Sequence, residues 1–174
     1  MHLIDKSVGF EGSTSILGNS IPIAVGLALS IKLHKTDQVS CVFFGDATVE
    51  EGVFFESINF SVLKELPVLF ICENNLYSVY SPLSVRQPKG RNIFEMVRGL
   101  GIDSEHVDGN DCLEVYSKTR TSIKNIRKGK RPYFIEFDTY RWREHCGPLF
   151  DNDLGYRTSE EFISWRGKDP IVMI

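Results

Sequence analysis

Two short polar segments of this sequence carry the side chains with which it could do chemistry. The first contains Gly45 and Asp46, and the second contains Asn74 and Asn75. A carboxylate and two amides are hard oxygen donors of the kind that Mg²⁺ takes when it leaves coordination positions open for phosphate groups. A glycine beside the aspartate lets the backbone approach a diphosphate closely. The residue types therefore indicate a metal-assisted diphosphate site, and a plain turn with an aspartate cap is the alternative.

Each polar segment follows a run with the composition of a buried β-strand. Cys41–Phe44 precedes the first segment and Pro67–Cys72 precedes the second. The first run is continuously apolar, which is typical of a central parallel strand buried on both faces, and we expect Cys41 and Cys72 to be small core residues. The spacing of apolar residues in Glu51–Lys64 predicts a helix between the strands, which makes a right-handed βαβ unit. Because open α/β sheets bind ligands beyond the carboxyl ends of their strands, we expect one shared site.

The alternation of helix and strand patterns continues along the chain. We expect helices over Pro22–His34, Ile93–Leu100 and Cys112–Lys128, and strands over Glu105–Val107 and Tyr133–Phe137. Asn19 and Ser20 before Pro22 predict an N-cap followed by a proline in the first turn. Repeated βα units without a linker predict a single α/β domain over residues 1–174, with a doubly wound, mostly parallel sheet.

The last part of the chain begins with a segment that has no periodicity. Asp138–Tyr156 predicts a long loop, and long loops inside compact domains are usually functional. Thr158 and Glu161 form a capping-box pattern that opens a last helix. Two interpretations stay open for the basic residues of this region, which are Arg141, Arg143 and Arg157. They bind a substrate carboxylate or an acidic partner surface, or they pair with Asp151 and Asp153 in a solvated loop.

Composition and charge exclude several classes of protein. The chain has 174 residues, of which 42% are hydrophobic and 25% charged, so it can bury a core and is neither disordered nor of low complexity. Its formal net charge is −3 with both signs interspersed, which argues against nucleic-acid binding through many phosphate contacts. The apolar stretches are too short to cross a bilayer, and the first residues lack a signal-peptide pattern. We therefore expect a cytoplasmic protein without a membrane partner.

The four cysteines form no C-x-x-C pair, so neither a zinc site nor a redox dithiol is indicated. Cys146 follows His145, and the two could be interpreted as a nucleophile and its base. Adjacent residues seldom point at each other, which argues against that pair. Considered in isolation, His145 is more typical of a loop histidine bonded to solvent or backbone than of a catalytic group.

The ordered motifs of the chain carry a stronger signal than its single residues. Gly45-Asp46, followed by Gly52 and then by Asn74-Asn75, resembles the thiamine diphosphate motif, which begins with Gly-Asp-Gly and ends with Asn-Asn. Further matching segments are Met1-His2-Leu3, Ile21-Pro22-Ile23-Ala24-Val25-Gly26, Leu66-Pro67-Val68, Glu73-Asn74-Asn75-Leu76-Tyr77, Thr139-Tyr140-Arg141 and Gly155-Tyr156-Arg157. Over essentially its whole length the chain resembles the alpha subunit of the 2-oxo acid dehydrogenase decarboxylase component, which serves pyruvate, branched-chain and acetoin dehydrogenases.

The resemblance implies a thiamine diphosphate-binding fold, of which this chain would be the diphosphate-binding domain, and a set of site residues. The implied ligands of Mg²⁺ are Asp46, Asn75 and the carbonyl of Tyr77. The residues implied to lie along the diphosphate are Gly45, Ala47 and Thr48. The backbone of Ser15 and Leu17 would meet the aminopyrimidine ring. His145 would contact the cofactor and act as the catalytic group that assists the intermediate or its transfer to a lipoyl group.

The resemblance also implies partners and a substrate class. The implied activity is oxidative decarboxylation of a 2-oxo acid together with a beta subunit, which in the family supplies the glutamate that activates the aminopyrimidine. A lipoyl-bearing acyltransferase is a further implied partner. We expect a fragment truncated at both ends relative to the family and inactive without the beta subunit. Acetoin- or transketolase-type cleavage of a ketol is an alternative, and so is a non-catalytic fragment that keeps the fold as an assembly module.

Three positions depart from the family pattern. Ala47 stands where the family usually has glycine, and its methyl group would crowd a close backbone approach to phosphate. Trp142-Arg143-Glu144 precedes His145 in place of the paired histidines of pyruvate dehydrogenases, which leaves the substrate and the acyl acceptor open. Cys146 stands where animal pyruvate dehydrogenases carry a regulatory serine, so control by phosphorylation is not expected there.

Overall fold

The computed structural model of the chain describes residues 2–129 and 131–174, so Met1, which begins one of the quoted motifs, lies outside the described residues. The helices are α1 (Ser20–His34), α2 (Gly52–Leu63), α3 (Leu83–Arg86), α4 (Ile93–Arg98), α5 (Cys112–Gly129), α6 (Ser159–Arg166) and α7 (Pro170–Met173). The strands are β1 (Ser40–Gly45), β2 (Val68–Asn74), β3 (Tyr77–Ser78), β4 (Ser81–Pro82), β5 (Asp103–Asp108) and β6 (Tyr133–Asp138). Three short 3-10 turns are η1 (Lys6–Val8), η2 (Asp46–Glu50) and η3 (Asn152–Leu154).

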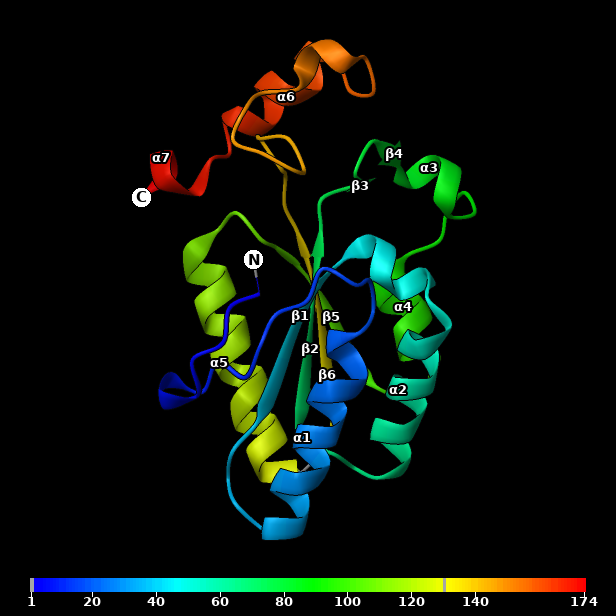
Figure 1. Cartoon of the computed structure of the whole chain (residues 1–174), viewed down its shortest axis with the longest axis vertical. Helices are drawn as coiled ribbons and strands as arrows, with labels where there is room; N and C mark the ends of the chain where they lie inside the picture. The colour runs from blue at the N-terminus through cyan, green and yellow to red at the C-terminus, as the bar shows by residue number, and fades with distance from the viewer. Residues whose placement is uncertain (1, 130) are drawn as a thin grey trace.

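Four strands form one parallel sheet in the order β1-β2-β6-β5, and β3 pairs with β4 in a separate antiparallel hairpin. Helices cover both faces of the sheet: α1, α2 and α4 lie on one face and α5 lies on the other (Figure 1). The first face buries the larger core, which contains Phe54, Phe70 and Phe134. The second buries a smaller cluster with Leu69 and Ile135. The expected doubly wound α/β architecture is confirmed.

The strand β1 lies at the edge of the sheet, and the expectation of a strand buried on both faces is wrong. Val42 and Phe44 point into the core, whereas Cys41 is exposed and Phe43 is 61% exposed. The reason is that α5 packs on β2, β5 and β6, and Phe43 lines an open cavity of about 800 Å³ beside that helix. Cys72 on the interior strand β2 is fully buried, as expected.

The two expected helix caps differ in outcome. Thr158 Oγ1 accepts a hydrogen bond from the N–H of Glu161 at 3.1 Å, which confirms the N-cap of α6. Asn19 makes no capping hydrogen bond because its own backbone is already helical, so the cap expected there is wrong. Gly18, in a left-handed conformation, accepts a hydrogen bond from the N–H of Ile21 at 3.2 Å and makes the turn into α1 instead.

The predicted elements are present with shifts of a few residues at their ends, and the short elements η1, η2, β3, β4, α3, η3 and α7 were not predicted. The hairpin β3–β4 and the helix α3 are too short to leave a periodic pattern in the sequence. They stand above the carboxyl ends of the sheet, beside the segment that leads to α6 and α7 (Figure 1). None of the helices in the described part of the chain has the length and apolar character needed to cross a membrane.

Candidate functional site

The carboxyl edge of the sheet brings the two predicted polar segments together. Gly45 is paired with Glu73 in the register of β1 and β2, so η2 begins beside the end of β2. The strand β3, which starts at Tyr77, contacts η2. The buried residues of η2 are Asp46, Ala47, Thr48 and Val49. The loops after β1 and β2 therefore form one site, as the order of strands in the sequence predicts.

Asp46 is paired with a cation that the sequence does not predict. One guanidinium nitrogen of Arg86 donates to the Oδ2 of Asp46, and another donates to the Oε1 of Glu50 at 2.5 Å. The side chains of Arg86 and Asp46 are only 10% and 1% exposed. Gln87 also donates to Glu50, at 3.1 Å. Arg86 comes from α3, 40 residues beyond Asp46, and no local pattern links the two positions.

The loop after β2 is held by its own asparagines. Asn74 Oδ1 accepts a hydrogen bond from the N–H of Leu76 at 3.1 Å, and Asn75 Oδ1 accepts one from the N–H of Tyr77 at 3.0 Å. These two Asx turns hold Leu76 at a φ of 69°, a left-handed conformation that is uncommon for leucine. The peptide groups on either side of Leu76 are therefore fixed beside η2.

The side chain of Tyr77 connects this site to the C-terminal part of the chain. Its hydroxyl donates to the carboxylate of Glu161, at 2.9 and 2.8 Å from the two oxygens, and its ring packs edge-on against Tyr156 with centroids 5.3 Å apart. Burial and the hydrogen bond to Glu161 raise the pKa of Tyr77, so the phenol stays protonated. The N–H of Glu161 thus donates to the helix cap Thr158, while its carboxylate accepts a hydrogen bond from Tyr77. The capping-box pattern does not predict this second contact.

Ser15 and Leu17 lie exposed on the segment before α1. The turn that follows them is packed against the start of α2, because a Cβ on Gly18 would lie 2.9 Å from Cγ1 of Val53 and 3.6 Å from Glu51. The contact places this segment beside Glu51, the residue that follows η2. Both predicted residues are therefore at the carboxyl edge of the sheet.

His145 lies exposed in the loop between β6 and η3. Within the described residues, no hydrogen bond joins it to Asp46 or Asn75. Nearby in the same loop, the guanidinium of Arg143 lies 3.8 Å from the centroid of the Phe150 ring. The structure therefore brings Asp46, Asn75 and Tyr77 to one edge, but within the described residues no hydrogen bond joins His145 to them.

The far end of this loop is anchored by a buried ion pair between Arg157 and Asp151. Arg157 also donates to the carbonyl of Arg141 at 2.5 Å, and Tyr156 donates to Asp151 at 2.8 Å. Burial alone would raise the pKa of Asp151, but the hydrogen bond from Tyr156 and the charges of Arg157 and Arg141 hold it below its usual value. Pairing with Asp151 is thus confirmed for Arg157, but the pair is buried and not part of a solvated loop.

A second polar cluster lies at the carboxyl ends of β5 and β6. Within the described residues, His106, Glu136 and Asp138 are the one group of His, Cys, Asp or Glu side chains close enough to share a metal ion, with ligand atoms within 4.8 Å of one another. His106 Nε2 lies 2.8 Å from Asp138 Oδ2. The carboxylate of Glu136 accepts hydrogen bonds from the amide of Asn74 at 2.7 Å and from the N–H of Phe94 at 2.9 Å. These bonds satisfy the carboxylate and fix Asn74 at the end of β2.

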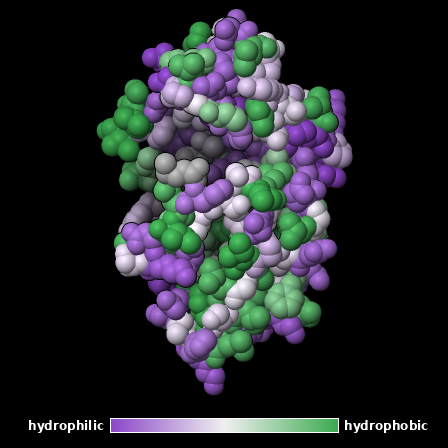
Figure 2. Space-filling model, in the orientation of Figure 1, coloured by the Kyte–Doolittle hydropathy of each residue, from purple (hydrophilic) through white to green (hydrophobic). Residues whose placement is uncertain are grey.

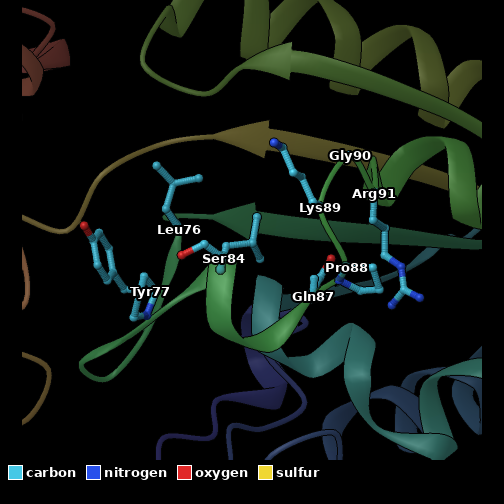
Figure 3. Close-up of a pocket in the computed structure, with 10 residues that line it drawn as sticks. Leu76, Tyr77, Ser84, Gln87, Pro88, Lys89, Gly90 and Arg91 are labelled. Carbon is cyan, nitrogen blue, oxygen red and sulfur yellow. The ribbon is translucent and has the colours of Figure 1, made fainter.

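A cavity of about 390 Å³ lies on the hairpin side of the site (Figure 3). Of the predicted site residues, Tyr77 alone lines it, together with residues of β4, α3 and the following loop. In the close-up, Tyr77 and Arg91 lie at opposite ends of the row of lining residues, and Lys89 lies between them. The cavity adds two cations, Lys89 and Arg91, on the hairpin side but is not lined by Asp46.

The residues of the edge fit a metal ion and a diphosphate. The carboxylate of Asp46 is a buried anionic oxygen donor at the end of β1, and the guanidinium of Arg86 occupies one of its two oxygens, Oδ2. A Cβ on Gly45 would meet nothing within 4 Å, which means that open space lies beside the backbone where the diphosphate is predicted. Ala47 is buried, and the crowding of a phosphate expected from its methyl group stays a prediction.

Comparison with known proteins gives matches over the whole chain. Residues 1–174 match the family model described as dehydrogenase E1 component. The chain is 33% identical over 174 residues to the pyruvate dehydrogenase E1 component subunit alpha of Rickettsia felis, covering 100% of this chain and 52% of that protein. It is 35% identical over 175 residues to the somatic mitochondrial subunit alpha of Homo sapiens, covering 100% of this chain and 43% of that protein. The chain thus spans about half the length of the curated relatives it matches.

A solved structure supports the fold. The chain resembles a structure described as a thiamin diphosphate-dependent enzyme from Mycobacterium smegmatis, with a TM-score of 0.53 and 18% sequence identity. The match covers 70% of this chain and 22% of that one. At this identity the likeness concerns the arrangement of strands and helices.

Proposed function

The chain belongs to the dehydrogenase E1 component family, and we propose that it is part of the alpha subunit of a thiamine diphosphate-dependent 2-oxo acid dehydrogenase. In this oxidoreductase the chain would form the part that binds the diphosphate. The observation that carries the proposal is the buried carboxylate of Asp46 at the end of β1, beside the loop of Asn75. Open α/β sheets bind their ligands at this edge. When bound, the cofactor supplies the electron sink for decarboxylation, and the protein supplies binding, orientation and proton transfer.

In this proposal three groups of the chain hold Mg²⁺: the carboxylate of Asp46, the amide oxygen of Asn75 and the carbonyl of Tyr77. The oxygen of Asn75 accepts one hydrogen bond from Tyr77 and keeps a second lone pair for a metal. An ion with open positions then neutralises the diphosphate. The backbone at Gly45, Ala47 and Thr48 lies along the diphosphate.

Two further groups complete the proposed site. The backbone of Ser15 and Leu17, which are exposed residues, meets the aminopyrimidine from the side of α1. His145, in a solvent-exposed loop, holds or moves a proton at the mouth of the site, because an imidazole titrates close to neutral pH. Because no hydrogen bond in the described residues ties it to Asp46 or Asn75, we assign it to proton transfer and not to anchoring.

The proposal includes a beta subunit that covers the other side of the cofactor, and a lipoyl-bearing acyltransferase that accepts the product. Ile171 and Val172 of α7 are 87% and 77% exposed, an apolar surface that a beta subunit, or further residues of a protein about twice this length, would cover. Figure 2 shows hydrophobic residues at the edge of the molecule where α7 lies. Exposed apolar surface of this kind often marks a protein contact.

Cofactor titration of the chain with its beta partner tests the proposal. We expect thiamine diphosphate to bind in the presence of Mg²⁺ and to bind far more weakly in EDTA, because Asp46 and Asn75 reach the diphosphate through the metal. Equal affinity in both conditions would overturn the metal assignment. The chain without its partner is expected to show no decarboxylation of a 2-oxo acid, and full turnover by a monodisperse monomer would overturn the assignment of a partner.

A further inference from the structure

Arg86 and Asp46 form a buried ion pair at the position proposed for the metal ion. We infer that Arg86 is a built-in counter-ion of Asp46 that competes with the divalent cation, so that this chain binds the metal together with a diphosphate and binds the metal alone only weakly. The inference rests on the proposed function, since it assigns the same carboxylate to the metal. It adds a residue that none of the sequence motifs contains.

The geometry of Arg86 blocks one oxygen of the proposed metal ligand. Its guanidinium donates to Asp46 and, at 2.5 Å, to Glu50, while its Nε donates to the carbonyl of Ser81 at 3.2 Å. Charge-assisted bonds from a rigid fork of donors are among the stronger polar contacts in proteins. A metal ion that takes the Oδ2 of Asp46 must therefore displace one arm of this fork.

The balance of charge determines when that displacement is favourable. Asp46 and Glu50 are acidic, and Arg86 neutralises one of them. A divalent ion by itself would place further positive charge beside the guanidinium in a largely buried site, where like charges repel strongly. A diphosphate brings negative charge of its own, so both cations fit once it is present. Glu50 keeps the released guanidinium within reach of the site.

Two neighbouring cations provide a contrast with Arg86. Lys89 and Arg91 follow it in the same segment and are exposed, and neither takes part in an ion pair among the described residues. Removing the charge of Lys89 changes the net charge of the chain by the same amount as removing that of Arg86. Lys89→Gln is therefore the matched control for Arg86→Gln.

Titration of the full chain with Mn²⁺, with free Mn²⁺ followed by electron paramagnetic resonance, tests the inference. We expect weak binding of Mn²⁺ alone to the wild type and binding roughly tenfold tighter or more to Arg86→Gln, because the repulsion is gone. The double variant Asp46→Asn, Arg86→Gln should lose the gain. Thiamine diphosphate should bring the wild type and Arg86→Gln close together, and Lys89→Gln should match the wild type.

Arg86→Lys keeps the charge but cannot bridge both carboxylates, so we expect an intermediate affinity for Mn²⁺ alone. If circular dichroism shows that Arg86→Gln does not fold, Arg86→Met, which also removes the charge, decides the question, and wild-type affinity for Mn²⁺ alone in the folded methionine variant overturns the inference. If the wild type binds Mn²⁺ together with thiamine diphosphate through Asp46, but Arg86→Gln does not change the affinity for Mn²⁺ alone, the counter-ion role of Arg86 is overturned. The proposed metal site then still stands. If Asp46→Asn leaves that joint binding unchanged, the proposed metal site and this inference both fall.

Discussion

Two segments that follow parallel strands at the same edge of the sheet are built differently. η2 is almost completely buried, and Arg86 of α3 forms an ion pair with its first residue, Asp46. The loop between β6 and η3 is anchored at its far end by Asp151 and Arg157, whereas His145 in its middle is exposed. The anchoring part of the proposed site is therefore preformed by the sheet. The part assigned to catalysis is left open to contacts from the ligand or from another subunit.

The largest effect is expected at the buried segment. Asp46→Ala should abolish metal-dependent binding of thiamine diphosphate, because it removes the carboxylate that holds the metal and leaves the charge of Arg86 without its buried partner. Calorimetric titration of the assembled protein measures the loss. Cys72→Ala, a buried change on the neighbouring strand, should leave the binding nearly intact. Retained metal-dependent binding in the Asp46 variant would show that the preformed segment is not the anchor.

In the open loop, His145→Ala should lower turnover by roughly 10²–10⁴-fold, the usual contribution of a positioned acid or base. Cofactor affinity should change little, since the anchoring contacts lie in the other segment. Cofactor titration and single-turnover kinetics on the assembled protein separate the two effects, and His34→Ala, a surface histidine at the end of α1, is the control. If the affinity for thiamine diphosphate falls by as large a factor as turnover, His145 helps to bind the cofactor. The two segments would then not differ in role.

The anchor of the open loop can be broken separately. Arg157→Gln removes the closer of the two guanidinium partners of the buried Asp151 and leaves only Arg141, at 3.7 Å. We expect a cost below the roughly 3–5 kcal/mol of a buried charge that loses every partner. Hydrogen exchange should show faster opening of residues 139–157, with the amides of β1 and β2 unchanged. Arg143→Gln, which alters an exposed guanidinium over Phe150, should have a much smaller effect. Equal loss of protection in β2 would mean that the two segments unfold as one unit.

A smaller effect is expected from acid. Because the pKa of Asp151 is lower in the folded chain than its ordinary value of 3.8, this carboxylate stabilises the folded loop above that pH. The stabilisation is lost as the pH falls through the lowered folded pKa. Hydrogen exchange of residues 139–157 should therefore accelerate below about pH 3.8 in the wild type. Asp151→Asn should lose this pH dependence, and a variant that keeps it would assign the effect to another carboxylate.

The smallest effect concerns reactivity alone. Burial, together with the charges of Glu136 and Asp46, raises the pKa of Cys72 well above its usual range, whereas Cys146 is exposed in the open loop. Alkylation followed by mass spectrometry should label Cys146 rapidly and Cys72 only after unfolding. Labelling of Cys72 at a similar rate in the folded chain would show that the buried edge opens as readily as the loop.

The sequence predicts the parts of this site that depend on position along a strand. Gly45, Asp46 and Asn75 follow apolar runs, and strand order alone then brings them to one edge. Strand order does not predict that Arg86 and Glu161 belong to the site. Arg86 comes from the four-residue helix α3, and Glu161 comes from the first turn of the distant helix α6. The edge position of β1 was also missed, since an apolar run does not tell how many helices will cover the strand.

That edge position has a consequence for the behaviour of the protein in concentrated solution. β1 (Ser40–Gly45) contains neither a charged residue nor a proline, and it pairs on one side only among the described strands. Its free peptide groups offer a template on which a strand of another molecule can add, and a short apolar strand of this kind favours such growth. Among the described residues, the strand that leads to Asp46 is therefore also an edge on which this chain can aggregate, and we expect a lysine in place of the exposed Cys41 to reduce that growth.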